Sequence, residues 1–373
     1  MRSAADVSGT LSPTRPSPSR AGLGTVVLVF FAVVTTAFLL VLSFGEGLLA
    51  WDVRFAYLPA ADAVLAGESP YPAVDDPILE DQKGYVYPPQ LVVALLPFAA
   101  LPVDLVALLA FAVMLVLVGL TLYVLGVRDV RCYAAAILWV PTVSGYLLGN
   151  VSIPLALAVA IVWRYRDSVW PPAVSLGFAV SAKLLLWPLL VWTVATRRLR
   201  ATAFAVVVGL VVTAAAWAAI GFDGVRGYPD LLRRLSEIQS ANSYSFVGIA
   251  ETLGLGEVAG RALALAVGGA LLVGCVLLAR RGDDVRSFTC AVVATLALSP
   301  IVWLHYLVVL LVPLAIARPR FSPLWLLPIL LWVSPRPGYA EGVQTFFPAI
   351  AVAILAAFLL ARPVTGRAAA ESA

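Results

Sequence analysis

The chain has 373 residues, of which 62% are hydrophobic and only 12% are charged, about half the charged share of an average soluble domain. This composition excludes a water-soluble globular protein, because too few polar side chains remain to cover its surface. The net charge of +4 does not indicate nucleic-acid binding, since the arginines form short clusters between apolar runs rather than one basic face.

The N-terminal residues 1–22 are rich in Ser, Pro and Ala and are predicted to form a disordered cytoplasmic tail. The apolar run at 25–42 that follows is long enough to span a bilayer core of about 30 Å. A cleaved signal peptide is the weaker alternative, because no small-residue cleavage site precedes a soluble domain. We expect one polytopic membrane domain over 23–361 and a cytoplasmic tail over 362–373.

Arginine clusters recur after each pair of apolar segments. They are Arg128 and Arg131; Arg164 and Arg166; Arg197, Arg198 and Arg200; Arg280, Arg281 and Arg286; Arg318 and Arg320; and Arg362 and Arg367. The positive-inside rule assigns these clusters to the cytoplasm, which predicts about six hairpins, about twelve membrane segments and two cytoplasmic termini. The fold class is therefore an all-α integral membrane protein, because helices satisfy their backbone hydrogen bonds within lipid.

Two of the connections expected on the external side are long, at residues 44–89 and 221–256. The first carries a large share of the carboxylates of the chain. Short helices are predicted near 56–66 and 230–239, and both are expected to lie at the membrane interface. The acidic pairs at 75–76 and 80–81 lack the ligand spacing of a calcium loop and are interpreted as a solvated face.

Four middle segments, at 133–148, 153–163, 173–181 and 184–195, are shorter than the roughly 20 residues that a span requires. Their external turns, at Gly149 and Asn150 and around Lys183, are then expected below the headgroup level. Irregular backbone at that depth is tolerated only beside a protein or water cavity. The sequence therefore predicts an external cavity floored by these turns.

Three isolated titratable residues are the candidates for chemistry. Asp52 follows the first span, where lost hydration would raise its pKa and make it a general base, or where it could cap the next helix. His305 is the single histidine and stands in an apolar run, either as a functional group or as a hydrogen-bonded core residue. Lys183, between two apolar runs, needs an anionic partner, either a phosphate or a carboxylate such as Asp52.

Other site chemistries have little support. No glycine-rich phosphate loop, metal-binding histidine cluster or nucleophile elbow is present, so neither a metal nor another cofactor is expected. The three cysteines, Cys132, Cys275 and Cys290, have no CxxC spacing and are interpreted as buried free thiols. The basic stretch at 226–234 is interpreted as a charged surface helix, with contact to lipid phosphates as the alternative.

Several motifs together resemble a known family. The stretch DVRFAYLPAADAVLAGESPY at 52–71, then YPP at 87–89 and Pro97, resembles the first external loop of the polyprenol-phosphate-mannose-dependent mannosyltransferases of glycosyltransferase family 87. LGNVS at 148–152 is similar to the LGQxN turn of that family, SAK at 181–183 to its lysine motif, and SPIVWLHY at 299–306 to its SPISWxHH element. This chain departs from the family at Asn150, Ser152 and Tyr306, and its external serine motif reads NSYS at 242–245.

The resemblance implies a multi-helix GT-C fold and an inverting transfer of mannose from a polyprenyl-phosphate carrier to a glycolipid or glycan on the external face, with an α-1,2 linkage. Asp52 and His305 become the base candidates, Lys183 the favoured phosphate partner and Arg54 the second choice. Candidate acceptor or sugar contacts are Tyr57, Tyr87, Asn150 and Trp303. No obligatory divalent ion is expected, because a cation already neutralises the leaving phosphate.

Two alternatives stay open at this stage. A GT-C enzyme could transfer another lipid-linked sugar, such as arabinofuranose or glucose. A transporter or flippase would place its polar site at mid-membrane depth between inverted repeats, and no such repeat is visible. The expected partners are the lipid-linked donor, the acceptor and membrane lipids, with the protein as a monomer or a weak homodimer.

Overall fold

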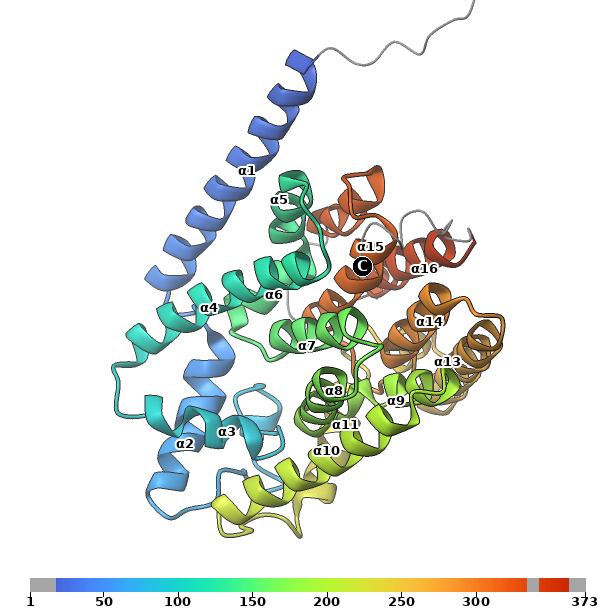
Figure 1. Ribbon diagram of the computed structural model, residues 1–373. Helices are drawn as coiled ribbons and strands as arrows, with labels where there is room; N and C mark the ends of the chain where they lie inside the picture. The colour runs from blue at the N-terminus through green and yellow to red at the C-terminus, as the bar shows by residue number, and fades with distance from the viewer. Residues whose placement is uncertain (1–17, 334–341, 362–373) are drawn as a thin grey trace, which may run out of the picture.

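The computed structural model describes residues 18–333 and 342–361, and these residues form helices without any β-strand (Figure 1). The α-helices are α1 (Pro18–Gly45), α2 (Leu58–Leu65), α3 (Gln90–Leu95), α4 (Val103–Val124), α5 (Val130–Leu138), α6 (Val140–Leu148), α7 (Ser152–Arg164), α8 (Trp170–Ala182), α9 (Pro188–Ala195), α10 (Leu199–Ala219), α11 (Tyr228–Gln239), α12 (Phe246–Thr252), α13 (Gly256–Arg280), α14 (Asp284–Ala297), α15 (Leu311–Ala317) and α16 (Phe346–Ala361). Shorter helical turns are a π-helix at Val53–Tyr57 and 3₁₀ turns at Pro77–Leu79, Leu96–Phe98, Leu184–Leu186, Leu304–Leu310, Pro323–Val333 and Gly342–Thr345.

Within the described residues, five helical segments are long and apolar enough to cross a membrane: Gly22–Gly45, Val103–Val124, Leu199–Ala219, Gly256–Arg280 and Gly342–Ala361. The pair α6 and α7 adds a sixth if it counts as one bent span. The described residues thus form a helical multi-pass membrane protein, while the count of about twelve segments stays a prediction for the shorter apolar helices. Helix α1 begins at Pro18, inside the predicted 1–22 tail; residues 1–17 and the 362–373 tail lie outside the described residues.

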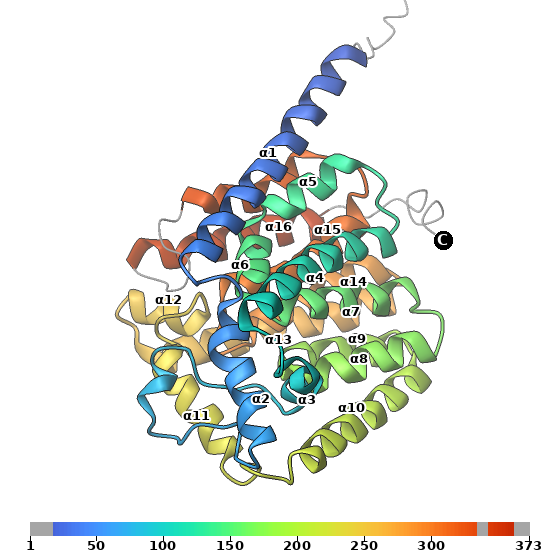
Figure 2. The ribbon, with the colours of Figure 1, turned by 90° about the vertical axis from the view of Figure 1, so that its left-hand side faces the viewer.

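The connections of the bundle separate to two sides. The α4–α5, α7–α8 and α9–α10 connections, which carry arginine clusters, lie on one side, and α2, α11 and α12 lie on the other (Figure 2). The helices predicted at 56–66 and 230–239 are confirmed as α2 and α11. This separation agrees with the grouping of the basic connections from the sequence, and the side that faces the cytoplasm stays a prediction.

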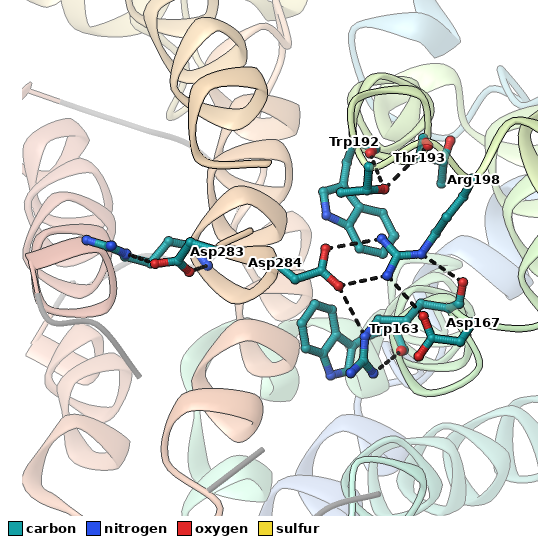
Figure 3. Close-up of polar contacts among 10 residues, drawn as sticks. Trp163, Asp167, Trp192, Thr193, Arg198, Asp283 and Asp284 are labelled. Atoms are coloured by element: carbon teal, nitrogen blue, oxygen red, sulfur yellow. Dashed lines mark hydrogen bonds and ion pairs between the residues drawn. The ribbon is translucent and has the colours of Figure 1, made fainter. Parts of the chain in front are cut away.

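On the basic side, Arg198 ties three connections together (Figure 3). Its guanidinium donates to both carboxylate oxygens of Asp284 at 3.1 and 2.8 Å, and to Asp167 at 3.2 Å. Its Nε donates to the backbone carbonyl of Arg166 at 2.8 Å. Because Arg198 and Asp284 are both largely shielded from solvent, this network fixes the ends of α7, α10 and α14 relative to one another.

The apolar segment predicted at 133–148 is divided into two helices, because α5 ends at Leu138 and α6 begins at Val140. Pro141 explains the break, since it has no N–H to donate to the preceding turn of a helix. Helix α6 then turns by 119° into α7 through Gly149 and Asn150. Gly149 adopts the left-handed conformation (φ +66°) that glycine accepts without strain.

Glycine also allows α8 and α10 to pack closely. A Cβ atom added to Gly177 would meet the carbonyl oxygen of Ala205 at 2.5 Å and the backbone nitrogen of Gly209 at 3.0 Å. Small residues at such positions are typical of helix pairs within membranes. The close pair α8–α10 forms one wall of the cavity described below.

Candidate active site

A large cavity, with a volume of about 1360 Å³, opens among the long connections at 44–89 and 221–256 and the turns between the short helices. Asp52, Lys183 and His305 all line it, together with Asn150 of the α6–α7 turn. These residues come from four separate parts of the chain. The cavity predicted beside the turns at Gly149–Asn150 and Lys183 is therefore present.

Backbone contacts place Asp52 beside the α6–α7 turn. The amide of Ala50 donates to the carbonyl oxygen of Leu147 at 2.7 Å. A Cβ atom on Gly149 would lie 2.8 Å from Cγ2 of Val53, so only glycine permits this approach. Because the two segments touch here, the side chain of Asp52 faces that of Asn150.

The carboxylate of Asp52 is held through one oxygen. Its Oδ2 accepts hydrogen bonds from Nδ2 of Asn150 at 2.5 Å and from the hydroxyl of Tyr57 at 3.1 Å. Asp52 precedes the π-helix Val53–Tyr57 but makes no side-chain capping bond to it. The helix-capping interpretation of this aspartate is therefore wrong.

Burial raises the pKa of Asp52 to about 6, although the hydrogen bonds from Asn150 and Tyr57 and the charge of Lys183 all act to lower it. Desolvation disfavours the charged carboxylate, whereas donors and a nearby cation favour it. The group is therefore mostly ionised at neutral pH and yet basic enough to accept a proton from a hydroxyl.

Lys183 places an ammonium group in the same cavity. Its Nζ lies 3.3 Å from the ring centroid of Tyr306 and 5.6 Å from that of Tyr87. Nζ is buried and has no hydrogen bond or ion pair within the described part of the chain. The proposed direct ion pair between Lys183 and Asp52 is thus not formed, and the two charges interact only at longer range.

The imidazole of His305 lies at the beginning of the Leu304–Leu310 turn and is only 6% exposed. Its ring packs against that of Tyr306, with a centroid distance of 5.0 Å. Nε2 is buried and contacts no hydrogen-bond partner among the residues described. If His305 were a core residue hydrogen-bonded between helices, this nitrogen would have a partner on a neighbouring helix. It has none among the described residues.

The remaining predicted site residues divide into two groups. Tyr57, Tyr87, Asn150 and Trp303 all line the cavity. Arg54 does not line it, because its guanidinium donates to the carbonyl of Leu49 at 2.7 Å and pairs with Asp104 at 2.5 Å. The structure thus brings the predicted residues together with the exception of Arg54.

Several lining residues were missed from the sequence. The ring of Tyr306 contacts the ammonium of Lys183. Tyr306 directly follows the predicted His305, and this adjacency was the sequence signal that could have identified it. A hydrogen bond links the long connections at 44–89 and 221–256: Nε2 of Gln82 donates to Oε1 of Gln239 at 3.2 Å. Polar residues in loops of this length give no sequence signal for such a pairing.

One part of the cavity, beside α8 and α10, is apolar. It is lined by Gly177 and Val180 of α8 and by Val206, Gly209 and Leu210 of α10. Val206 is 44% exposed and Leu210 66% exposed on the outer face of the bundle. The cavity lining therefore includes both Lys183 and exposed apolar residues of α10, a helix long and apolar enough to cross a membrane.

Within residues 18–333 and 342–361, no group of three His, Cys, Asp or Glu side chains is placed to hold a metal ion. The three cysteines are buried and free, as predicted. The acidic and basic side chains that line the cavity are thus the carboxylates of Asp52 and Asp81, the ammonium groups of Lys83 and Lys183, and the imidazole of His305. The ammonium of Lys83 is paired with Asp81 at 3.2 Å, whereas that of Lys183 has no carboxylate partner in the part of the chain that the structure describes.

These features define a polytopic membrane protein with a cavity that combines a buried carboxylate, an imidazole and an ammonium group without an anionic partner in the described residues. The model of glycosyltransferase family 87 matches residues 85–300, more than half of the chain, and the protein belongs to this family.

Two characterised relatives are similar over much of the chain. One is the polyprenol-phosphate-mannose-dependent alpha-(1-2)-phosphatidylinositol pentamannoside mannosyltransferase of Mycobacterium tuberculosis, 28% identical over 68% of this chain and 59% of the relative. The other is the polyprenol-phosphate-mannose-dependent alpha-(1-2)-phosphatidylinositol mannoside mannosyltransferase of Mycolicibacterium smegmatis, 29% identical over 85% of this chain and 78% of the relative. The match thus spans less than two thirds of the first relative. No solved structure matches the chain significantly.

Proposed function

We propose that this protein transfers mannose from a polyprenyl-phosphate-mannose donor to a glycolipid or glycan acceptor on the external face of the cytoplasmic membrane. The transfer inverts the anomeric carbon and forms an α-1,2 linkage. Support comes from family membership, from the names of both relatives, and from the chemistry of the cavity.

The observation that carries the proposal is the unpaired state of the ammonium of Lys183. The ammonium contacts the rings of Tyr306 and Tyr87 but has no anionic partner within the described chain, which is unfavourable for a buried cation in a membrane protein unless an anion joins it during function. The phosphate of a lipid-linked sugar supplies that anion. Exposed apolar residues of α10, among them Val206 and Leu210, also line the cavity, and a polyprenyl chain would be accommodated beside them.

The reaction requires one proton acceptor and one leaving-group partner. The acceptor hydroxyl attacks the anomeric carbon of mannose, the bond from that carbon to the phosphate oxygen breaks, and the hydroxyl proton moves to the carboxylate of Asp52. Lys183 neutralises the charge that develops on the departing polyprenyl phosphate. Attack on the face opposite the leaving group inverts the configuration.

His305 lies on the same cavity, and its free Nε2 makes it the second candidate for the base. Trp303, Tyr57 and Tyr87 offer aromatic and hydroxyl groups to the sugars. Aromatic faces and hydroxyls are suited to sugar rings, which have both apolar and hydrogen-bonding surfaces.

The test is a transfer assay with purified protein in phospholipid nanodiscs. Radiolabelled polyprenyl-phosphate-mannose, polyprenyl-phosphate-glucose and polyprenyl-phosphate-arabinofuranose are each supplied with a mycobacterial glycolipid extract, and the product linkage is determined by NMR. We expect transfer from the mannose donor alone and an α-1,2 product. Transfer from only one of the other two donors, or no transfer from any of them by folded protein, would overturn the proposal.

A further inference from the structure

Asn150 was expected to contact a sugar, but its amide is fully used within the protein. Nδ2 donates to Oδ2 of Asp52 at 2.5 Å and to the hydroxyl of Tyr87 at 3.0 Å. Oδ1 accepts from the backbone N–H of Ser152 at 2.9 Å and from its hydroxyl at 2.8 Å. A primary amide has two N–H donors and one oxygen with two lone pairs, so no capacity is left for a substrate.

Ser152 fixes the orientation of this amide. Asn150 is 1% exposed and Ser152 is 2% exposed, so water does not compete for these bonds. If the amide rotated by 180°, its oxygen would face the carboxylate of Asp52 and its NH₂ group would face both donors of Ser152. Such a state leaves buried groups unsatisfied, and is therefore unfavourable.

The two oxygens of Asp52 have different environments as a result. Oδ2 accepts both hydrogen bonds, from Asn150 and from Tyr57. Oδ1 accepts no hydrogen bond from the described residues, and Asp52 lines the cavity. A carboxylate held by one oxygen keeps the other available for a hydroxyl in a fixed direction.

We propose that Asn150, locked by the hydroxyl of Ser152, is a positioning residue that immobilises Oδ2 of Asp52 and reserves Oδ1 for the proton of the acceptor hydroxyl. This inference rests on the proposed transfer reaction for its catalytic meaning. The hydrogen-bond geometry itself does not depend on the identity of the sugar. Asn150 touches no reacting atom and acts only through Asp52.

The first experiment is independent of any substrate. The carboxyl C=O band of Asp52 is titrated by infrared difference spectroscopy in nanodiscs, with Asp52→Asn identifying the band. Asn150→Ala removes a donor to the carboxylate, so the titration midpoint is expected to move up by about one pH unit. Ser152→Ala is expected to shift it in the same direction by less, and Ser152→Thr, which keeps the hydroxyl, to restore it.

The other titratable groups facing Asp52 are unchanged in these variants. They are Lys183 from the α8–α9 connection, Tyr57 of the π-helix, Tyr87 of the first external connection, and His305 and Tyr306 of the Leu304–Leu310 turn. A shift of the titration midpoint of Asp52 therefore reports a change in the hydrogen bond from the Asn150 amide. The matched control is Ser287→Ala, which removes a buried hydroxyl bonded to the carbonyl of Cys275 at 2.8 Å, away from the cavity. It should leave the midpoint in place.

The second experiment measures transfer from radiolabelled polyprenyl-phosphate-mannose. Ser152→Ala and Asn150→Ala should lower kcat by about tenfold to a hundredfold with little change in the KM for the donor, because misplaced catalytic groups lose rate rather than ground-state binding. An unshifted infrared midpoint in folded Asn150→Ala protein would overturn the positioning role. If the wild-type protein transfers no sugar but the midpoint shifts, the proposed reaction fails while the positioning geometry stands.

Discussion

Asn150 and Asp52 are 98 positions apart in the sequence, yet Nδ2 of Asn150 lies 2.5 Å from Oδ2 of Asp52. Two features produce this contact: the sharp α6–α7 turn at Gly149 and the backbone bond from Ala50 to Leu147. The base candidate is thus positioned by a turn that does not itself carry any charge.

Gly149→Ala should sharply reduce transfer and lower the thermal stability of the protein. The added methyl group meets Val53 at 2.8 Å, and the positive φ of 66° strains any residue with a Cβ atom. Gly269→Ala in α13 is the matched control, because no atom lies within 4 Å of the new methyl group. Equal transfer rates and unfolding temperatures in the two variants would show that the turn does not constrain Asp52.

Transfer should depend on pH through Asp52. The carboxylate must be deprotonated to accept a proton, and its pKa is about 6, so kcat/KM should fall as the pH is lowered through about 6 and level off above about 7. The measurement is a rate profile from pH 5 to pH 8 in nanodiscs. A rate that is constant between pH 5 and pH 7 would exclude a base with this pKa.

Asp52→Asn should increase stability at neutral pH. Because the folded-state pKa lies above its usual value of 3.8, folding favours the protonated form, and stability is lost as the pH rises from about 4 through about 6. The neutral amide avoids this loss. Thermal unfolding of both proteins in detergent at pH 7 and at pH 4 should show a gain for the variant only at pH 7; a lower unfolding temperature at pH 7 would contradict the burial of an ionised carboxylate.

Lys183→Met should weaken binding of polyprenyl phosphate by at least about tenfold, because the variant removes the unpaired cation of the cavity. Arg54→Met should have a much smaller effect, since that guanidinium is paired with Asp104 outside the cavity lining. Binding is measured by isothermal titration in nanodiscs. The reverse order of effects would make Arg54 the phosphate partner and remove Lys183 from that role.

The sequence predicted three isolated titratable residues that line the cavity together, for a physical reason. A charged or titratable side chain in an apolar chain is unfavourable without a function, so Asp52, Lys183 and His305 stood out. The cavity followed from segments too short to span a bilayer. The positions of the short helices α2 and α11, in the long connections at 44–89 and 221–256, followed from their local composition.

Pairings between distant residues were not predictable in this way. Arg54 looked like a free cation because Asp104 is 50 positions away, at the beginning of α4. Asn150 looked like a sugar ligand because neither its contact with Asp52 nor the locking role of Ser152 leaves a periodic pattern. The break at Trp139 was the exception, since Pro141 could have revealed it locally.

In the proposed reaction, Asp52 removes the proton from the acceptor hydroxyl during sugar transfer from a lipid phosphate. The most direct test compares wild-type protein and Asp52→Asn in nanodiscs, with labelled polyprenyl-phosphate-mannose and a purified phosphatidylinositol mannoside as acceptor. We expect the variant to bind donor normally and to transfer at least about a hundredfold more slowly. Transfer at the wild-type rate by Asp52→Asn would contradict the claim.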